Sequence, residues 1–161
     1  MLYGENITLG NQAAGSGENI EIDSTNSSGT FSVDSSFQGN ITFKGSSAID
    51  NVTLGSGNDT IALNSGDDVV TAGAGDDTID GGEGIDVAIF SGDKSNYSIT
   101  ETGYAQYQIN DDQGTDGTDT LSNIETLRFN DQIYDITPSG KIVEGDSSDE
   151  SLESGSGDDF I

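Results

Sequence analysis

The sequence contains no cysteine, no histidine and no tryptophan, and it has a single proline. Without cysteine and histidine the chain can form no disulfide and no zinc site of the usual kind. It also cannot supply a Ser-His-Asp or Cys-His pair for nucleophilic catalysis. With 30 acidic residues, pairs of carboxylates are inevitable and indicate no active site, and the four scattered basic residues argue against a calcium-assisted polysaccharide lyase, so enzymatic activity is not expected.

Basic residues are almost as scarce, with 4 Lys and Arg among 161 residues. Nucleic acids and anionic lipid surfaces are bound by clustered basic side chains, so neither is an expected partner. No stretch approaches the ~20 apolar residues that cross a bilayer, so membrane insertion is not expected. The first 30 residues also lack the basic and then apolar pattern of a secretory signal peptide.

The residues that are present are mainly small or acidic. The 30 Asp and Glu residues give a net charge of −26, 23 residues are glycine, and 30% are hydrophobic. Such a composition is typical of disordered chains, because too little apolar area is buried to offset the entropy of ordering. A surface of this charge attracts cations, and oxygen ligands suit hard cations such as Ca²⁺.

A nine-residue period runs without a gap through residues 54–89. Each unit has glycine at its fourth position, aspartate at its sixth and an aliphatic residue at its eighth. These are Gly57, Gly66, Gly75 and Gly84; Asp59, Asp68, Asp77 and Asp86; and Ile61, Val70, Ile79 and Ala88. An acidic linker has no reason to keep an aliphatic side chain in phase with aspartate, so the period indicates a repeated structural unit.

The chemistry of each position predicts the fold. Glycine permits a tight turn that directs backbone carbonyls inward, and the aspartate adds a carboxylate to them. A strand of about three residues follows, with one aliphatic side chain facing the core. If nine residues form half a coil, turns 18 residues apart stack ~4.8 Å apart and can share an ion. We therefore predict an all-β fold, a parallel β-roll or β-helix solenoid with calcium-binding turns and a C-terminal β cap.

The pattern resembles the repeats-in-toxin (RTX, hemolysin-type) calcium-binding family, whose repeat is G-G-x-G-x-D-x-U-x with U aliphatic. The resemblance implies that an ion takes carbonyls from positions two and four and the carboxylate of position six. The repeat 18 residues later adds carbonyls from positions one and three and its own aspartate. The first site so implied comprises Gly55, Gly57, Asp59, Ala72, Ala74 and Asp77, and the second comprises Asn64, Gly66, Asp68, Gly81, Glu83 and Asp86. Leu54, Leu63, Ala72 and Asn64 depart from the glycines of the consensus, and Leu63 with Asn64 makes the second site the less regular one.

Two further aspartates fall at the sixth position of degenerate repeats. Asp50, within residues 45–53, could form an additional site with Asp68. Asp119, within 114–122, could complete a site against Asp77 or Asp86. Both are candidate calcium ligands.

The flanks of the repeats suggest four segments. We expect N-terminal solenoid rungs in 1–53, the RTX β-roll in 54–89, and capping β-hairpins with a degenerate repeat in 90–138. Residues 139–161 are expected to be an acidic linker followed by the truncated start of a further repeat. Short apolar-x-apolar triplets in the first segment and a hairpin turning near Gly103 support this division.

Folding of the repeats is expected to depend on the ion. A coil of 18 residues buries about two aliphatic side chains, worth roughly 1.5–3 kcal/mol each. Ordering the backbone costs roughly 1–2 kcal/mol per residue. Binding free energy at a site that exists only in the folded state must supply the difference.

The resemblance further implies a segment of a larger secreted or surface bacterial protein, such as an adhesin. Such a protein would leave the cell unfolded by type I secretion and fold on Ca²⁺ outside. The expected partners are calcium ions and the rest of a longer parent chain. An alternative is an accessory polysaccharide-binding module of a secreted enzyme, with a polysaccharide or other surface partner.

Overall fold

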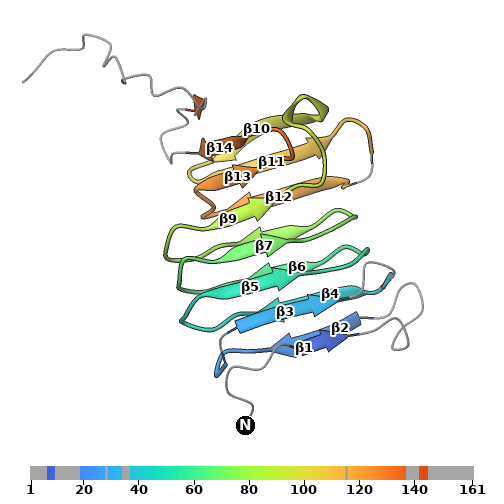
Figure 1. Ribbon diagram of the computed structural model, residues 1–161, viewed down its shortest axis with the longest axis vertical. Helices are drawn as coiled ribbons and strands as arrows, with labels where there is room; N and C mark the ends of the chain where they lie inside the picture. Colours follow the sequence, from blue (N-terminus) through green and yellow to red (C-terminus); the bar gives the residue numbers. More distant parts are fainter. Residues whose placement is uncertain are drawn as a thin grey trace, which may run out of the picture.

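The computed structural model describes residues 7–9, 19–27, 29–33, 37–114, 116–136 and 142–144. Apart from one short 3₁₀ turn, Lys94–Asn96, the regular structure of these residues is β. The strands are stacked as successive rungs along one axis (Figure 1). The prediction of an all-β solenoid is confirmed.

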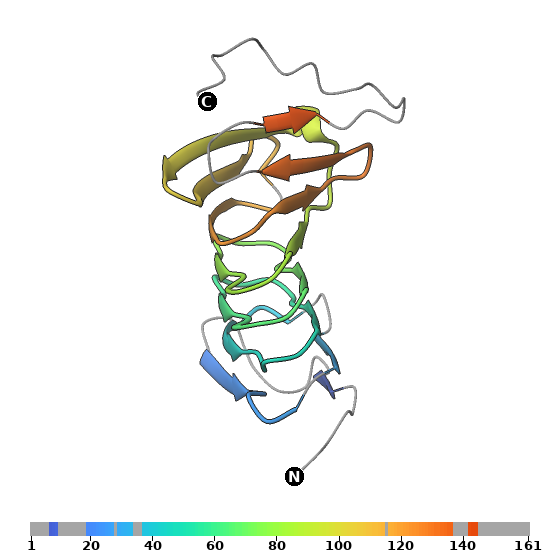
Figure 2. The same ribbon diagram turned by 90° about the vertical axis from the view of Figure 1, so that its left-hand side faces the viewer.

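Consecutive strands alternate between two parallel stacks that face each other (Figure 2). One stack consists of β1 (Ile7–Leu9), β3 (Gly29–Val33), β5 (Asp50–Thr53), β7 (Val69–Thr71), β9 (Val87–Ile89) and β13 (Thr126–Arg128). The other consists of β2 (Asn19–Asp23), β4 (Asn40–Lys44), β6 (Thr60–Ala62), β8 (Thr78–Asp80) and β12 (Thr118–Ser122). Within the repeats, paired residues are 18 apart, as Thr60 and Thr78 are, so one coil is two nonapeptides.

The eighth position of every repeat faces the space between the stacks. One inward column contains Phe43, Ile61, Ile79 and Leu121, each paired with the next in register and each buried. The facing column contains Phe31, Val52, Val70, Ala88 and Leu127. Each three-residue strand therefore buries one side chain, and the first-position residues Leu54, Leu63 and Ala72 are buried as well.

An antiparallel cap covers the C-terminal end of the roll. Strands β10 (Tyr97–Gly103) and β11 (Gln106–Asp111) form the predicted hairpin, and β11 pairs with β12. On the other sheet, β14 (Ile133–Ile136) pairs with β13 and β15 (Ile142–Glu144) pairs with β14. The hairpin carries no aromatic stripe, because Tyr97 and Tyr107 are buried and only Tyr104 at the turn is exposed.

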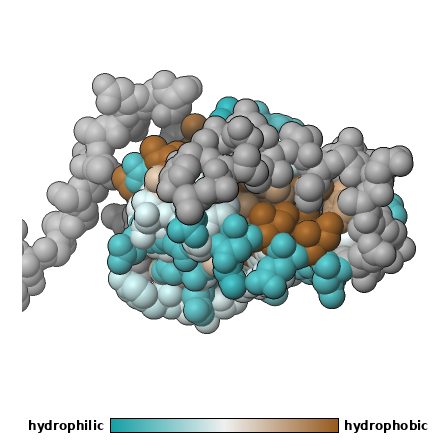
Figure 3. Space-filling view, turned by 90° about the horizontal axis from the view of Figure 1, so that it is seen from below, coloured by the Kyte–Doolittle hydropathy of each residue, from teal (hydrophilic) through white to brown (hydrophobic). Residues whose placement is uncertain are grey.

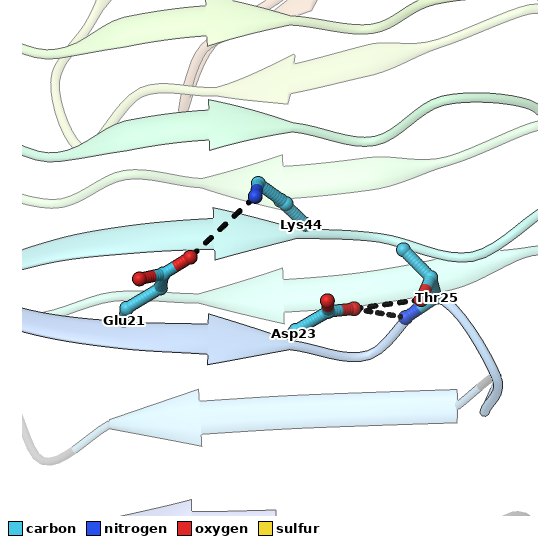
Figure 4. Close-up of polar contacts among 4 residues, drawn as sticks. All are labelled: Glu21, Asp23, Thr25 and Lys44. Atoms are coloured by element: carbon cyan, nitrogen blue, oxygen red, sulfur yellow. Dashed lines mark hydrogen bonds and ion pairs between the residues drawn. The ribbon is translucent and has the colours of Figure 1, made fainter.

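The opposite end of the roll is formed by strands β1 and β2. Ile20 and Ile22 of β2 pack against the core but are only partly buried, and apolar surface is visible between polar side chains at this end (Figure 3). A Lys44–Glu21 ion pair of 3.5 Å links β4 to β2 on the outer face, beside Asp23, which accepts hydrogen bonds from Thr25 (Figure 4). Both ionic side chains are exposed, so the pair contributes little to stability.

Across the part of the chain that the structure describes, no helix is both long and apolar enough to pass through a membrane. Residues 137–141 and 145–161 lie outside the described part, and with them most of the segment expected to hold a linker and a further repeat start.

Candidate calcium centre

The turns on one edge of the roll stack by direct backbone contact. Turn 72–77 lies on turn 54–59 through a parallel bridge between Ser56 and Ala74. The Gly57 amide donates to the Ala74 carbonyl at 2.8 Å, and the Ala74 amide donates to the Gly55 carbonyl at 3.1 Å. The structure thus brings the two halves of the first predicted ligand set side by side.

The other edge repeats this arrangement. The Gly66 amide donates to the Glu83 carbonyl at 2.9 Å, and the Glu83 amide donates to the Asn64 carbonyl at 2.8 Å. Asn64, at a position where the family has glycine, adopts φ 75°, and its side-chain amide donates to the Gly45 carbonyl at 2.6 Å. Because asparagine tolerates the left-handed region, the departure from the consensus is accommodated and ties this turn to the rung before it.

The sixth-position aspartates form a ladder along each edge. The Oδ1 atom of Asp77 accepts the amide of Asp59, and that of Asp86 accepts the amide of Asp68, both at 2.8 Å. In the rung before, Asp59 accepts the Ile41 amide at 2.7 Å. One oxygen of each carboxylate is therefore used to orient the side chain against the preceding rung.

The second oxygen of these carboxylates has no hydrogen-bond partner. Among the described residues, the buried side-chain polar atoms that lack a hydrogen-bond partner are the Oδ2 atoms of Asp59, Asp68, Asp77 and Asp86. All four side chains are 0–2% exposed. A buried, unpaired carboxylate oxygen is costly, so each of these carboxylates must be neutralised, by a cation or by a proton.

The donor set fits Ca²⁺. Each stacked pair of turns offers two carboxylates and a group of backbone carbonyls, all of them oxygen ligands of the kind that Ca²⁺ prefers. The structure's described residues contain no cluster of three or more Asp, Glu, His or Cys side chains suited to a metal. Carbonyls of both turns would hold an ion together with the aspartates.

The electrostatics of the ladder agree with this requirement. Burial raises the pKa of Asp59 to about 6 and that of Asp86 to about 6. Burial, with repulsion from Asp59 and other neighbouring carboxylates, raises the pKa of Asp77 to about 7. Without a cation the carboxylates hold protons at a pH where aspartate is normally ionised.

No side chain would fit at the fourth position of the turns. A Cβ atom on Gly75 would lie against the Gly57 carbonyl oxygen, and one on Gly84 against the Gly66 carbonyl oxygen. Both glycines also have positive φ angles, 132° and 145°. The close approach of the two backbones is what places carbonyls of both turns next to the carboxylates.

Asp119 and Asp50 extend the ladders at opposite ends. Asp119 lies opposite Asp77 rather than Asp86, because β12 pairs with β8, and its Oδ1 accepts the Asp77 amide at 2.9 Å. Burial raises the pKa of Asp119 to about 8. The Asp50 amide donates to Asp68 at 2.7 Å, but the Asp50 Oδ2 atom accepts hydrogen bonds from Ser46 in its own turn.

Glu125 is a member of the ladder that the sequence interpretation missed. Its Oε2 atom accepts the Asp86 amide at 2.8 Å, where a sixth-position aspartate would lie. The sequence does contain a sign of this further repeat. Leu127, which pairs with the eighth-position residue Ala88, follows Glu125 by two residues, as the eighth position follows the sixth. A glutamate in place of aspartate and an irregular turn before it concealed the repeat.

A second ladder at the fifth position was also not foreseen. The side chain of Asn40 accepts the Asn58 amide at 2.9 Å, and Asn58 accepts the Asp76 amide at 3.1 Å. Asp76 in turn accepts the Thr118 amide at 2.8 Å. These side chains satisfy amides that the turn leaves without backbone partners.

Short parallel strands, glycine-aspartate turns and inward carboxylate oxygens without partners together define a calcium-type β-roll. The model of the RTX calcium-binding nonapeptide repeat, in four copies, matches residues 45–88 and 142–161. The predicted resemblance is confirmed: these residues match RTX repeats, which bind Ca²⁺. No curated protein matches the chain.

Proposed function

We propose that this chain is a segment of a larger secreted or surface bacterial protein, and that its repeats fold when they bind Ca²⁺ outside the cell. The observation that carries the proposal is the set of four buried Oδ2 atoms without partners on Asp59, Asp68, Asp77 and Asp86. When these carboxylates are ionised, a fold that buries their oxygens is stable only if a cation compensates them.

Two calcium sites are proposed for the repeats. The first joins the turn carrying Asp59 to that carrying Asp77, and the second joins the turns of Asp68 and Asp86. The ligands are those of the two sets implied by the repeat pattern. A third site between Asp77 and Asp119 is proposed at the junction with the cap. Asp50 is the weakest candidate, because Ser46 already occupies its Oδ2 atom.

The residues act in two ways when the ion is bound. Each aspartate is oriented through one oxygen by an amide of the preceding rung, and its other oxygen is left for the ion. The ion supplies the positive charge that offsets repulsion between stacked carboxylates. Affinities of extracellular calcium modules, ~10⁻⁴–10⁻³ M, would leave the chain unfolded where Ca²⁺ is scarce.

A calcium titration by isothermal calorimetry, with circular dichroism on the same samples, tests the proposal. The wild-type chain should take up at least two ions and gain β structure, and EDTA should reverse the change. Asp77→Asn should lose at least one ion and raise the midpoint for folding. Asp80→Asn, in the same repeat, is the control, since it removes the same charge but can still accept the hydrogen bond from Asn123. Equal effects of the two variants, or no response at millimolar Ca²⁺, would refute the proposal.

A further inference from the structure

Asp116 lies where the last turn of one calcium edge meets the cap. It is 5% exposed and precedes the ladder residue Asp119 by three positions. Its backbone carbonyl accepts the amide of Gly75 at 3.2 Å, so it rests directly on turn 72–77. Its backbone is therefore part of the stacked turns.

The Asp116 side chain points the other way, into the cap. Its Oδ1 accepts the Ser91 hydroxyl at 2.7 Å, and its Oδ2 accepts the Ser91 amide at 2.9 Å and the Tyr97 hydroxyl at 2.5 Å. Both oxygens have partners, in contrast to the ladder aspartates Asp59, Asp68, Asp77 and Asp86, whose Oδ2 atoms have none. Asp116 is thus suited to positioning rather than to binding an ion.

Tyr97 links the Asp116 carboxylate to the aromatic core of the cap. Its ring packs against Phe90 and Phe129, with centroids 5.3 and 5.0 Å away, and its hydroxyl accepts the Gly92 amide at 2.9 Å. Burial, with the Asp116 carboxylate adding to it, raises the pKa of the Tyr97 phenol, so the phenol remains a donor. Charge-assisted hydrogen bonds of this kind are the strong ones in a buried network.

Asp116 lies in the loop between β11 and β12 and is also hydrogen-bonded to the end of β11. The Asp116 amide donates to Asp111 Oδ2 at 2.9 Å, and the Asp111 amide donates to the Gly117 carbonyl at 2.8 Å. Through its backbone this one buried residue contacts the Gly75 turn and the hairpin strand β11, and through its side chain it contacts the Ser91 segment and the aromatic core.

We propose that Asp116 is a positioning residue that couples calcium binding at the Asp77 and Asp119 turns to ordering of the cap. The inference rests on the proposed function, since it requires Ca²⁺ to order turn 72–77. When that turn is formed, the Gly75 amide fixes the Asp116 backbone, and the fixed carboxylate aligns Ser91 and Tyr97. The cap then orders at the calcium concentration at which the repeats fold.

Hydrogen exchange measured by mass spectrometry across a calcium titration of the full chain tests the coupling. In the wild type, amides of 60–80 and of 97–111 should gain protection at the same midpoint. In Asp116→Asn and in Tyr97→Phe, the midpoint for 97–111 should rise roughly tenfold, as expected for loss of a hydrogen bond to a charged group, while that for 60–80 stays within about twofold. Tyr104→Phe, which alters an 82% exposed tyrosine in the same hairpin, should change neither midpoint.

The outcomes separate this inference from the proposed function. If the wild-type repeats gain no protection with Ca²⁺, the proposed function fails and the coupling fails with it. If they do, but the variants lower cap protection equally at all calcium concentrations with an unchanged midpoint, Asp116 is merely structural and the coupling alone is overturned. The coupling is equally overturned if both regions shift together.

Discussion

At the scale of single residues, each sixth-position aspartate divides two tasks between its oxygens. In Asp77, Oδ1 accepts the Asp59 amide while Oδ2 is buried without a partner. Asparagine could keep the first contact but would lose the charge that an ion needs. Glycine has an equally strict task at the fourth position, where the two backbones approach so closely that no Cβ atom fits.

The glycine requirement can be tested with two alanine substitutions. Gly75 and Gly29 both have positive φ, 132° and 145°, so alanine strains the backbone at each. A Cβ atom at Gly75 would meet the Gly57 carbonyl, whereas at Gly29 nothing lies within 4 Å. We expect Gly75→Ala to lower the free energy of unfolding by ~1–3 kcal/mol more than Gly29→Ala, the usual cost of overpacking. Urea denaturation at saturating Ca²⁺ measures both, and equal losses would contradict the crowding argument.

At the scale of the elements, each three-residue strand contributes one side chain to the core. Ile79 of β8 is 2% exposed and is paired in register with Ile61 and Leu121. Its neighbour Thr78 faces outward and is exposed. Each of these strands therefore depends on a single buried aliphatic residue, and its loss cannot be compensated within the same strand.

Truncation of Ile79 tests how much the strand depends on this side chain. Ile79→Ala should lower the free energy of unfolding at saturating Ca²⁺ by ~2–5 kcal/mol, the range for large-to-small changes in a core. Because folding and binding are linked, the calcium midpoint for folding should rise in parallel. Thr78→Ala, on the exposed side of the same strand, should change stability by no more than ~0.5 kcal/mol. A calcium midpoint unchanged in Ile79→Ala would show that the core and the ion sites are not linked.

The sequence predicted the repeated elements well because their period couples glycine, aspartate and an aliphatic residue. The strands of residues 60–89, the alternation of two sheets and the 97–109 hairpin were all foreseen. The degenerate repeat at 114–122 indicated where the roll resumes after Phe90, but the period could not show whether it stacks on the turn of Asp77 or on that of Asp86. Strand β12 is the next rung, pairing with β8, but the hairpin β10–β11 is inserted before it along the chain.

The ligand ladder was less predictable than the strands. The Oδ1 contacts between successive aspartates depend on how the turns stack. Glu125 belongs to the ladder only because β13 pairs in register with β9. The partners of Asp116 come from the cap, 19 and 25 residues away in sequence, so no local pattern identifies them. Side-chain direction at irregular turns is set by tertiary packing.

At the scale of the whole molecule, the net charge of −26 and the buried ladders oppose folding without a cation. The pKa of Asp77 is raised to about 7 and that of Asp119 to about 8 in the folded chain, against 3.8 for the free side chain. Protons and Ca²⁺ therefore compete for the same oxygens, and each can neutralise them. The two modes of neutralisation have opposite pH dependence.

This opposition yields a prediction for the whole chain. A carboxyl group whose pKa is raised on folding favours the folded state fully below its unfolded pKa, near 4, and ceases to do so as the pH rises through its folded pKa, here about 6 to 8. In EDTA, β structure should therefore increase as the pH falls from 8 to 5. Where the chain is already folded without Ca²⁺, its affinity for Ca²⁺ should weaken as the pH falls, because the ion binds only the ionised carboxylates and must displace their protons. Far-UV circular dichroism in EDTA at several pH values measures the first slope, and calorimetric titration of the folded chain with Ca²⁺ measures the second. A calcium affinity of the folded chain that does not depend on pH would mean that the buried aspartates are not the ligands.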